Sequence, residues 1–217
     1  MEFLADEENR RLFLQGYFTT IALWAGAFAV SLVIGLIVAS ARVWGNAILQ
    51  AYARGYVEFF RNTPLLVQLA FYATLLAPNN LGVTGDPMLA ALIGLGIYTG
   101  AYTTEAIRSG ILSVDARQIE AARSLGLSQF QALRLVVLPQ AVRTVIPPLG
   151  NLAIALVKNT AVATGIAAVE LLQAARILEG RPPYIFPFVA LLLGYWSLTL
   201  PLAWAVNRVE RRLGFAR

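Results

Sequence analysis

The chain has 217 residues, of which 58% are apolar and 13% are charged, and its formal net charge is +5. Soluble domains carry about 25% charged residues, so this composition indicates a membrane protein. The sequence contains no cysteine and no histidine, which excludes disulfides and removes the commonest metal ligand and general base. We therefore predict neither a catalytic residue nor a metal site.

Apolar stretches long enough to cross a bilayer occur five times in the sequence. A helical span needs roughly 20 mostly apolar residues, and charged residues separate these stretches from one another. The predicted fold is an all-α integral membrane protein that forms a single domain over 1–217. The predicted spans are 15–41, 56–77, 87–107, 144–169 and 183–206.

Arginines are unevenly distributed among the segments that join the predicted spans. They gather after spans one, three and five, and basic residues mark the cytoplasmic side of membrane proteins. We expect the N-terminus outside and the C-terminus in the cytoplasm, which makes 115–138 the largest cytoplasmic loop. Topology then explains the positive charge, and no nucleic acid partner is needed. The arginines in question are Arg42, Arg54, Arg61, Arg108, Arg117, Arg123, Arg134, Arg143, Arg208, Arg211, Arg212 and Arg217.

The loop 115–138 has the start and stop signals of two short helices. Its first part consists of strong helix formers, Gly126 can take the positive φ that ends a helix, and Ser128 is a natural N-cap for the next helix. We expect Pro139 to limit that second helix.

The pair Ala121 and Ala122 offers a flat surface for close approach, with charge at its edge from Glu120 and Arg123. Such a helix suits docking into the groove of a partner. The alternative is an amphipathic helix that lies on the membrane surface.

Lys158 is the only lysine of the chain and lies inside the fourth apolar stretch, next to Asn159 and Thr160. A charge at mid-membrane costs roughly 2.5 to 3.5 kcal/mol on insertion scales, so such groups usually face protein or water. We interpret these residues as part of a substrate pathway, in which the ammonium attracts a substrate carboxylate or a carboxylate of a gate. Snorkelling of Lys158 toward the cytoplasmic interface is an equal alternative.

Two further groups of residues are candidates for the pathway. Tyr98, Tyr102 and Glu105 follow one another at intervals of four and three residues, which puts them on one stripe of a helix. For Glu105 we favour the simpler interpretation, which is pairing with Arg108.

Asn62, Thr63 and Pro64 predict a break in the second span, because Pro64 removes a backbone donor and leaves the carbonyl four residues back free. Broken helices often mark binding sites in transporters, so Asn62 and Gln68 are candidates for a second wall of the substrate pocket. A kink without ligand contact is equally compatible. A similar break is expected at Pro147 and Pro148, where it would hinge the loop to a gate.

Several of these stretches resemble one protein family. Glu120-Ala121-Ala122, followed by Gly126, Val136 and Leu138-Pro139, resembles the EAA motif of bacterial ABC importer permeases, with Val136 in place of the usual isoleucine. Other stretches resemble the polar amino acid branch of that family, and they are Tyr56–Gln68, Glu105–Gly110, Leu138–Ala141 and Pro147–Asn151.

The resemblance implies a type I ABC importer permease fold in the bacterial cytoplasmic (inner) membrane. In that family the EAA loop docks into a cleft on the ATP-binding subunit. We therefore predict that coupling to the ATPase falls on Glu120, Ala121, Ala122, Arg123 and Gly126. The resemblance also implies a dimer of ATP-binding cassette subunits and an extracytoplasmic solute-binding protein, with a polar amino acid as substrate.

The sequence contains no phosphate-binding loop of the Gly-x-x-x-x-Gly-Lys-Ser/Thr type. We expect no cofactor on this chain, since ATP and magnesium belong to the partner. Five helices have too few walls to enclose a polar route, so a second permease chain, identical or different, is expected.

The rival interpretations are a membrane enzyme, a passive channel or scaffold, and an exporter. Which amino acid is carried stays open among glutamate, glutamine, arginine and histidine types, because Ala161-Val162-Ala163 departs from the Ser-Leu pair of many members.

Overall fold

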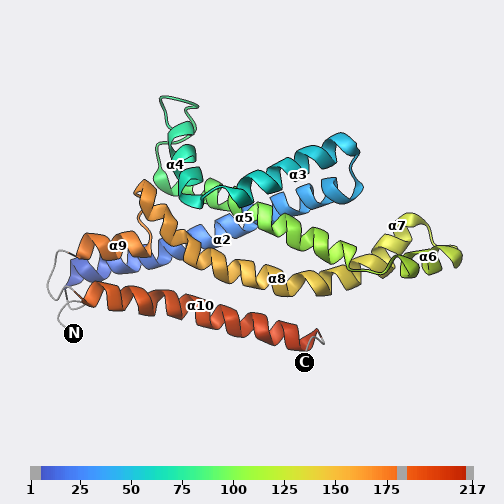
Figure 1. Ribbon diagram of the computed structural model, residues 1–217. Coiled ribbons are helices and arrows are strands. Elements are labelled where there is room, and N and C mark those ends of the chain that lie inside the picture. Colours follow the sequence, from blue (N-terminus) through green and yellow to red (C-terminus); the bar gives the residue numbers. More distant parts are fainter. Residues whose placement is uncertain (1–5, 180–184, 214–217) are drawn as a thin grey trace.

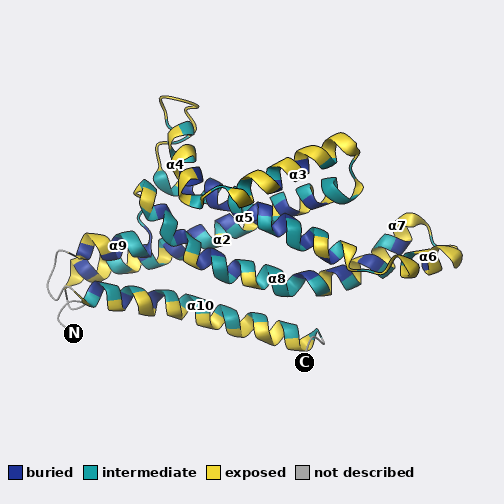
Figure 2. Ribbon diagram, viewed as in Figure 1, coloured by how far each residue is buried: buried dark blue, intermediate teal, exposed yellow. Residues whose placement is uncertain are grey.

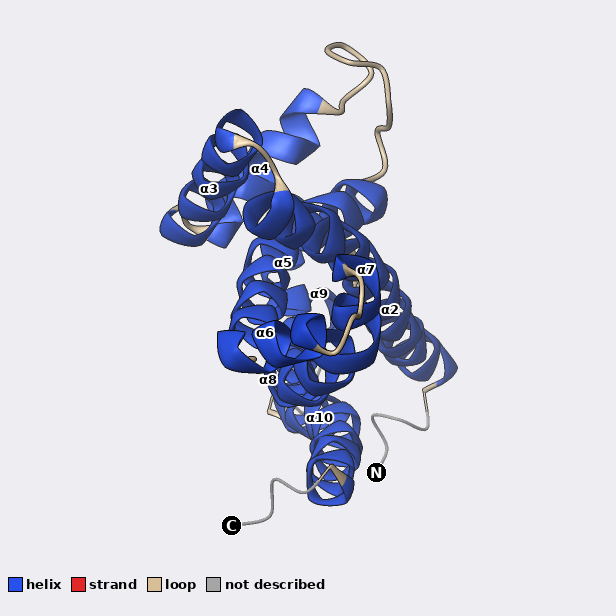
Figure 3. Cartoon of the chain, turned by 90° about the vertical axis from the view of Figure 1, so that its right-hand side faces the viewer, coloured by secondary structure: helices blue, strands red, loops and turns tan. Residues whose placement is uncertain are grey.

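The computed structural model describes residues 6–179 and 185–213, in which every regular element is a helix (Figure 1, Figure 3). Helices are expected here, because hydrocarbon offers no water and a helix satisfies its own backbone groups. The elements are α2 (Glu7–Trp44), α3 (Ala47–Asn62), α4 (Leu65–Leu75), α5 (Pro87–Leu112), α6 (Ala116–Ser124), α7 (Gln129–Ala132), the π-helix η1 (Leu133–Val137), α8 (Leu138–Asn159), the 3₁₀-helix η2 (Thr160–Ile166), α9 (Leu171–Leu178) and α10 (Phe186–Arg212).

Three helical stretches of the described residues are long and apolar enough to cross a membrane, namely Glu7–Trp44, Gln129–Ile166 and Phe186–Arg212. The second predicted span is divided between α3 and α4, and the third, 87–107, lies within the longer α5. The start of the fifth predicted span, at residues 183–184, lies outside the described residues. The count of five spans and the orientation stay predictions.

α5 is the central helix of the molecule and packs against α2, α3, α4 and α8. Figure 2 shows it mostly buried or half-buried, whereas α10 is mostly exposed or half-buried. The large apolar side chains that α10 exposes include Leu192, Trp196 and Trp204. Lipid or another chain must cover such a surface, which agrees with a membrane protein.

Small residues allow α2 and α5 to approach closely. A Cβ atom added at Gly96 would lie 2.6 Å from Val30, and one at Gly100 would lie 2.8 Å from Ile34. The Gly-x-x-x-Gly spacing of α5 therefore serves packing within the chain.

The ends of the helices sort into two groups (Figure 1). The start of α2 and all of α9 lie at one end of the molecule, while α6 and α7 lie at the other, toward which α10 runs. Viewed from the latter end, α3 and α4 lie on the opposite side of the molecule from α10, with α5 and α8 between them (Figure 3).

Two expectations about proline were wrong. Pro139 does not end the helix of the loop, because α7, η1 and α8 form one continuous helical run. The π-helix η1, directly before Pro139, has wider turns that accommodate the missing backbone N–H of proline. Pro147 and Pro148 lie inside α8 without breaking it. Neighbouring helices hold α8 along this length, so the lost backbone bonds do not end the helix.

Two alanine substitutions test the packing of α2 against α5. A Cβ atom at Gly35 would lie 2.4 Å from Thr103 Cγ2, whereas one at Gly55 would meet nothing within 4 Å. Alanine gains about 1 kcal/mol over glycine in a helix, but overpacking costs about 1–3 kcal/mol. We expect Gly35→Ala to lower, and Gly55→Ala to raise or maintain, the melting temperature of the purified permease in detergent. Equal effects of the two substitutions would contradict the packing.

Candidate functional site

The loop between α5 and α8 is built as a capped helix-turn-helix. Asp115 caps α6 by accepting a hydrogen bond from the backbone N–H of Arg117 at 2.9 Å. The side chain of Arg117 also binds this carboxylate, and both contacts lower the pKa of Asp115 from its usual value. The helix start is thus held by an ionised cap at neutral pH.

The end of α6 has the geometry predicted from the sequence. Gly126 has φ +87°, and its N–H donates to the Arg123 carbonyl at 2.9 Å, while the N–H of Leu127 donates to Ala122 at 3.2 Å. These two bonds form a Schellman motif, which satisfies carbonyls at a helix end. Ser128 then caps α7 in a reciprocal capping box with Gln131, so both signals are confirmed.

The exposed surface of α6 differs in one residue from the surface expected. Glu120, Ala121 and Arg123 are exposed, but Ala122 is buried within the chain. A groove of about 820 Å³ lies between this loop and the ends of α2 and α5, and Trp44 is among its lining residues. The docking role of the loop stays a prediction.

The helix break predicted at Pro64 is confirmed, since α3 ends at Asn62 and α4 begins at Leu65. The carbonyl left free by Pro64 belongs to Phe60, and the Gln68 Nε2 donates to it at 3.0 Å. The same amide nitrogen reaches the Thr63 carbonyl at 3.1 Å and its hydroxyl at 2.7 Å. Gln68 is therefore the side chain that satisfies the backbone carbonyls left free at the helix break.

Gln68 is buried, and its Oε1 has no hydrogen-bond partner among the described residues. An unpaired oxygen at this depth is costly, because no water replaces the lost bond. Asn62 is exposed and donates to Glu58 at 3.2 Å within the last turn of α3. The substrate role predicted for both residues stays a prediction.

A second discontinuity lies at the end of α8, where the helix tightens into η2. Lys158 is exposed there, Asn159 is half-buried and Thr160 is buried. No ion pair of Lys158 occurs within residues 6–179 and 185–213. η2 packs on α4, and a Cβ atom at Gly165 would lie 2.3 Å from Leu66. The two helix breaks therefore lie side by side.

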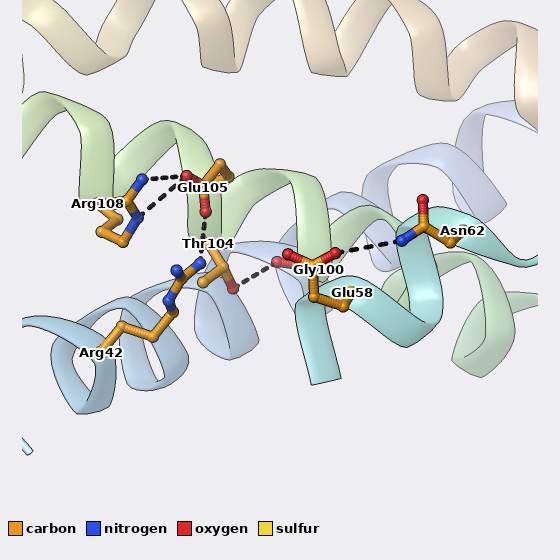
Figure 4. A network of polar contacts seen from close by, with 7 residues as sticks. All are labelled: Arg42, Glu58, Asn62, Gly100, Thr104, Glu105 and Arg108. Atoms are coloured by element: carbon orange, nitrogen blue, oxygen red, sulfur yellow. Dashed lines mark hydrogen bonds and ion pairs between the residues drawn. The ribbon is translucent and has the colours of Figure 1, made fainter. Parts of the chain in front are cut away.

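Glu105 is the centre of an ion network at the opposite end of α5 (Figure 4). It accepts hydrogen bonds from Arg42 on α2 at 2.6 Å and from Arg108 on its own helix. The predicted pairing with Arg108 is present, and Arg42 is an additional partner 63 residues away. All three side chains are partly buried, so the network joins α2 to α5.

The two tyrosines of the predicted stripe face one another. The hydroxyls of Tyr98 and Tyr102 are 3.1 Å apart, and the guanidinium of Arg61 lies 5.3 Å from the centre of the Tyr102 ring. This cation–π contact brings α3 to the stripe. The stripe and Lys158 lie on different helices, and a shared pathway between them stays a prediction.

One buried charge was missed in the sequence. Glu170 is fully buried and caps α9, where Thr164 and Tyr195 also donate to it. The signal available was a carboxylate at the end of a long apolar stretch, directly before an amphipathic helix.

Residues 31–215 match the family described as binding-protein-dependent transport system inner membrane component. The chain belongs to this family. It is 39% identical to the probable glutamine ABC transporter permease protein GlnM of Bacillus subtilis, over 95% of each chain. It is also 35% identical to the glutamine transport system permease protein GlnP of Escherichia coli, over 93% of each chain.

Solved structures agree with this family. An amino acid ABC transporter crystallised with histidines matches 98% of this chain and 99% of its own chain, with a TM-score of 0.85 and 32% identity. The MetNI methionine ABC transporter, at 22% identity and a TM-score of 0.78, shows the same fold. As a family member, the chain is a non-catalytic inner-membrane permease subunit that works with an ATP-binding subunit, which hydrolyses ATP, and with a permease partner.

The network around Glu105 predicts unequal effects of two alanine substitutions. Glu105→Ala leaves the guanidinium groups of Arg42 and Arg108 without their carboxylate, which should cost about 1–3 kcal/mol. Arg108→Ala keeps the ion pair between α2 and α5 and should cost less than about 1 kcal/mol. We expect a larger fall in melting temperature for Glu105→Ala in detergent. Equal losses would show that the contact with Arg42 adds no stability.

Proposed function

We propose that this chain is the channel-forming permease subunit of an ATP-driven importer for polar amino acids. The observation that carries the proposal is the family membership together with the capped α6 helix, which presents Glu120, Ala121 and Arg123 at the end of the molecule. A rigid, exposed and charged short helix is suited to a cleft on an ATP-binding subunit.

The described helices provide a route for coupling. α7, η1, α8 and η2 form one helical run from Gln129 to Ile166. This run begins within the loop 115–138, which we call the coupling loop, and passes through Lys158. Gln140 on α8 also donates to Gln118 on α6 at 2.6 Å. A displacement of α6 would therefore move the far end of this run, because a packed helix transmits motion as a rigid body.

The chemistry along the pathway suits a zwitterionic solute. Lys158, which makes no ion pair within residues 6–179 and 185–213, offers an ammonium to a carboxylate. Gln68 Oε1, which has no hydrogen-bond partner in the same part of the chain, is an acceptor on the neighbouring helix break. Both lie at discontinuous helices, which are the usual positions of substrate sites in transporters. Relatives named for glutamine and a neighbour named for amino acids support this substrate class.

The complete transporter requires partners that this chain does not supply. We propose a pair of ATP-binding cassette subunits that hold ATP and magnesium, a second permease chain, identical or different, and an extracytoplasmic solute-binding protein. The binding protein distinguishes an importer from an exporter, and dependence on ATP distinguishes it from a passive channel.

Charge reversal on α6 tests the coupling. Glu120→Arg should abolish ATP-dependent uptake of labelled amino acids by liposomes that contain the permease, its ATPase and its binding protein, because it reverses the charge that α6 presents to the ATP-binding subunit. The ATPase should also fail to copurify with the variant. Glu179→Arg, the same change at the exposed residue that directly follows α9, should retain the ATPase, because α9 lies at the other end of the molecule (Figure 1). Uptake that persists in Glu120→Arg or proceeds without ATP would favour the channel alternative.

Replacement of Lys158 tests the pathway. Lys158→Ala should lower the maximal uptake rate about tenfold, the effect of losing one charge-assisted hydrogen bond, and Lys158→Arg should restore part of it. The measurement is uptake at varied amino acid concentration with equal amounts of complex. Normal transport by Lys158→Ala with unchanged affinity would mean that the ammonium only snorkels.

A further inference from the structure

Glu170 is the only fully buried ionisable side chain among the residues that the structure describes. It precedes α9, and its relative exposure is 0%. A buried carboxylate persists only where hydrogen bonds replace its lost water. The surroundings of Glu170 therefore show what the protein gains from it.

Four donors satisfy the two carboxylate oxygens. Oε1 accepts from the Thr164 hydroxyl at 2.5 Å and from the Gln173 N–H at 2.9 Å. Oε2 accepts from the Tyr195 hydroxyl at 2.7 Å and from the Leu172 N–H at 3.0 Å. The two side-chain donors come from η2 and from α10, so a single carboxylate joins η2, α9 and α10.

α2 encloses the same point from another side. Thr19 donates to the Val169 carbonyl at 2.7 Å, and Thr20 accepts from the N–H of Leu171 at 3.0 Å. A Cβ atom at Gly16 would lie 2.7 Å from Ala174 on α9. The residues on both sides of Glu170 are thus fixed to α2 as well, and α9 cannot shift without breaking several of these contacts.

The fixed point lies next to the pathway residues in the chain. η2 begins at Thr160, directly after Lys158 and Asn159, and a terminal 3₁₀ segment is weakly held by its own hydrogen bonds. The buried Thr160 side chain also interacts with Tyr195. Tyr195 therefore joins the first residue of η2 to Glu170 beyond its end.

We propose that Glu170 is a positioning residue for translocation, which fixes the Lys158–Thr160 segment against α2 and α10 through Thr164 and Tyr195. This inference rests on the proposed function. Glu170 lies outside the pathway and keeps the end of α8 rigid, so that motion from the coupling loop reaches the substrate.

The test removes the two side-chain donors one at a time and leaves the carboxylate in place. Tyr195→Phe removes the link to α10, and Thr164→Val removes the link to η2. Thr199→Val is the matched control, because its hydroxyl donates to the Tyr195 carbonyl of its own helix at 2.8 Å and so joins no second element among the described residues. Two further variants change the carboxylate itself. Glu170→Gln is the conservative change, which keeps the size of the side chain, and Glu170→Ala is the severe change, which removes the polar group.

The first measurement is the number of amino acids imported per ATP hydrolysed in liposomes that hold the complete transporter. We expect about a tenfold fall for Tyr195→Phe and Thr164→Val, the effect of losing a hydrogen bond to a charged group, at unchanged basal ATPase activity. Thr199→Val should match the wild type, and Glu170→Gln should retain more coupling than Glu170→Ala. Combination of Tyr195→Phe with Lys158→Ala should be less than additive, since one residue acts through the other.

The second measurement does not depend on transport. Because the chain has no cysteine, a spin label at Ala161→Cys reports the mobility of η2 in the assembled complex. Tyr195→Phe and Thr164→Val should increase that mobility, and Thr199→Val should leave it unchanged.

The outcomes separate the inference from the proposed function. If the wild type shows no ATP-dependent uptake but the label is mobilised, the proposed function fails and the positional contact stands. If the wild type transports and the variants keep both its coupling ratio and its label mobility, the inference is overturned. A lower melting temperature with an unchanged coupling ratio would assign Glu170 to stability alone and would overturn it too.

Discussion

The structure depends on one constraint, which is that a backbone group inside hydrocarbon has no water to bind. An uninterrupted helix satisfies this constraint with its own backbone hydrogen bonds. Where a helix is interrupted, a side chain has to bond the backbone groups that are left free. Gln68 does this where Pro64 separates α3 from α4, by donating to the Phe60 carbonyl at 3.0 Å. Glu170 does the same after η2, where its carboxylate accepts from two backbone N–H groups.

These repairs allow the fold to place irregular backbone where transport needs it. The two breaks are adjacent, since Leu66 on α4 packs over Gly165 on η2. Around them the bundle is tightly packed through small residues of α2 and α5, which leave little freedom for independent sliding. A continuous helical run from Gln129 to Ile166 then connects this region to the loop at the other end. Rigid connection and local discontinuity together suit a transporter whose energy comes from a partner.

Local signals in the sequence were sufficient for much of the fold. The helical break at Pro64, the positive φ of Gly126 and the capping by Ser128 each depend on a few neighbouring residues, and each is present. The EAA motif and its flanking stretches were sufficient for the family, because a resemblance of motifs requires no knowledge of packing. The pairing of Glu105 with Arg108 was also predictable, because a separation of three residues on one helix brings two side chains within reach of each other.

The sequence by itself therefore determined the membrane class, the all-helical fold, the helix ends at Gly126 and Ser128, and the family. Only the tertiary structure decided that Gln68 repairs a helix, that Ala122 is buried, that Pro147 stays inside α8 and that Arg42 shares Glu105. It also revealed Glu170, whose side-chain donors come from separate elements. The physical reason is that each of these facts depends on contacts between residues far apart in the chain, and such contacts leave no periodic pattern in the sequence.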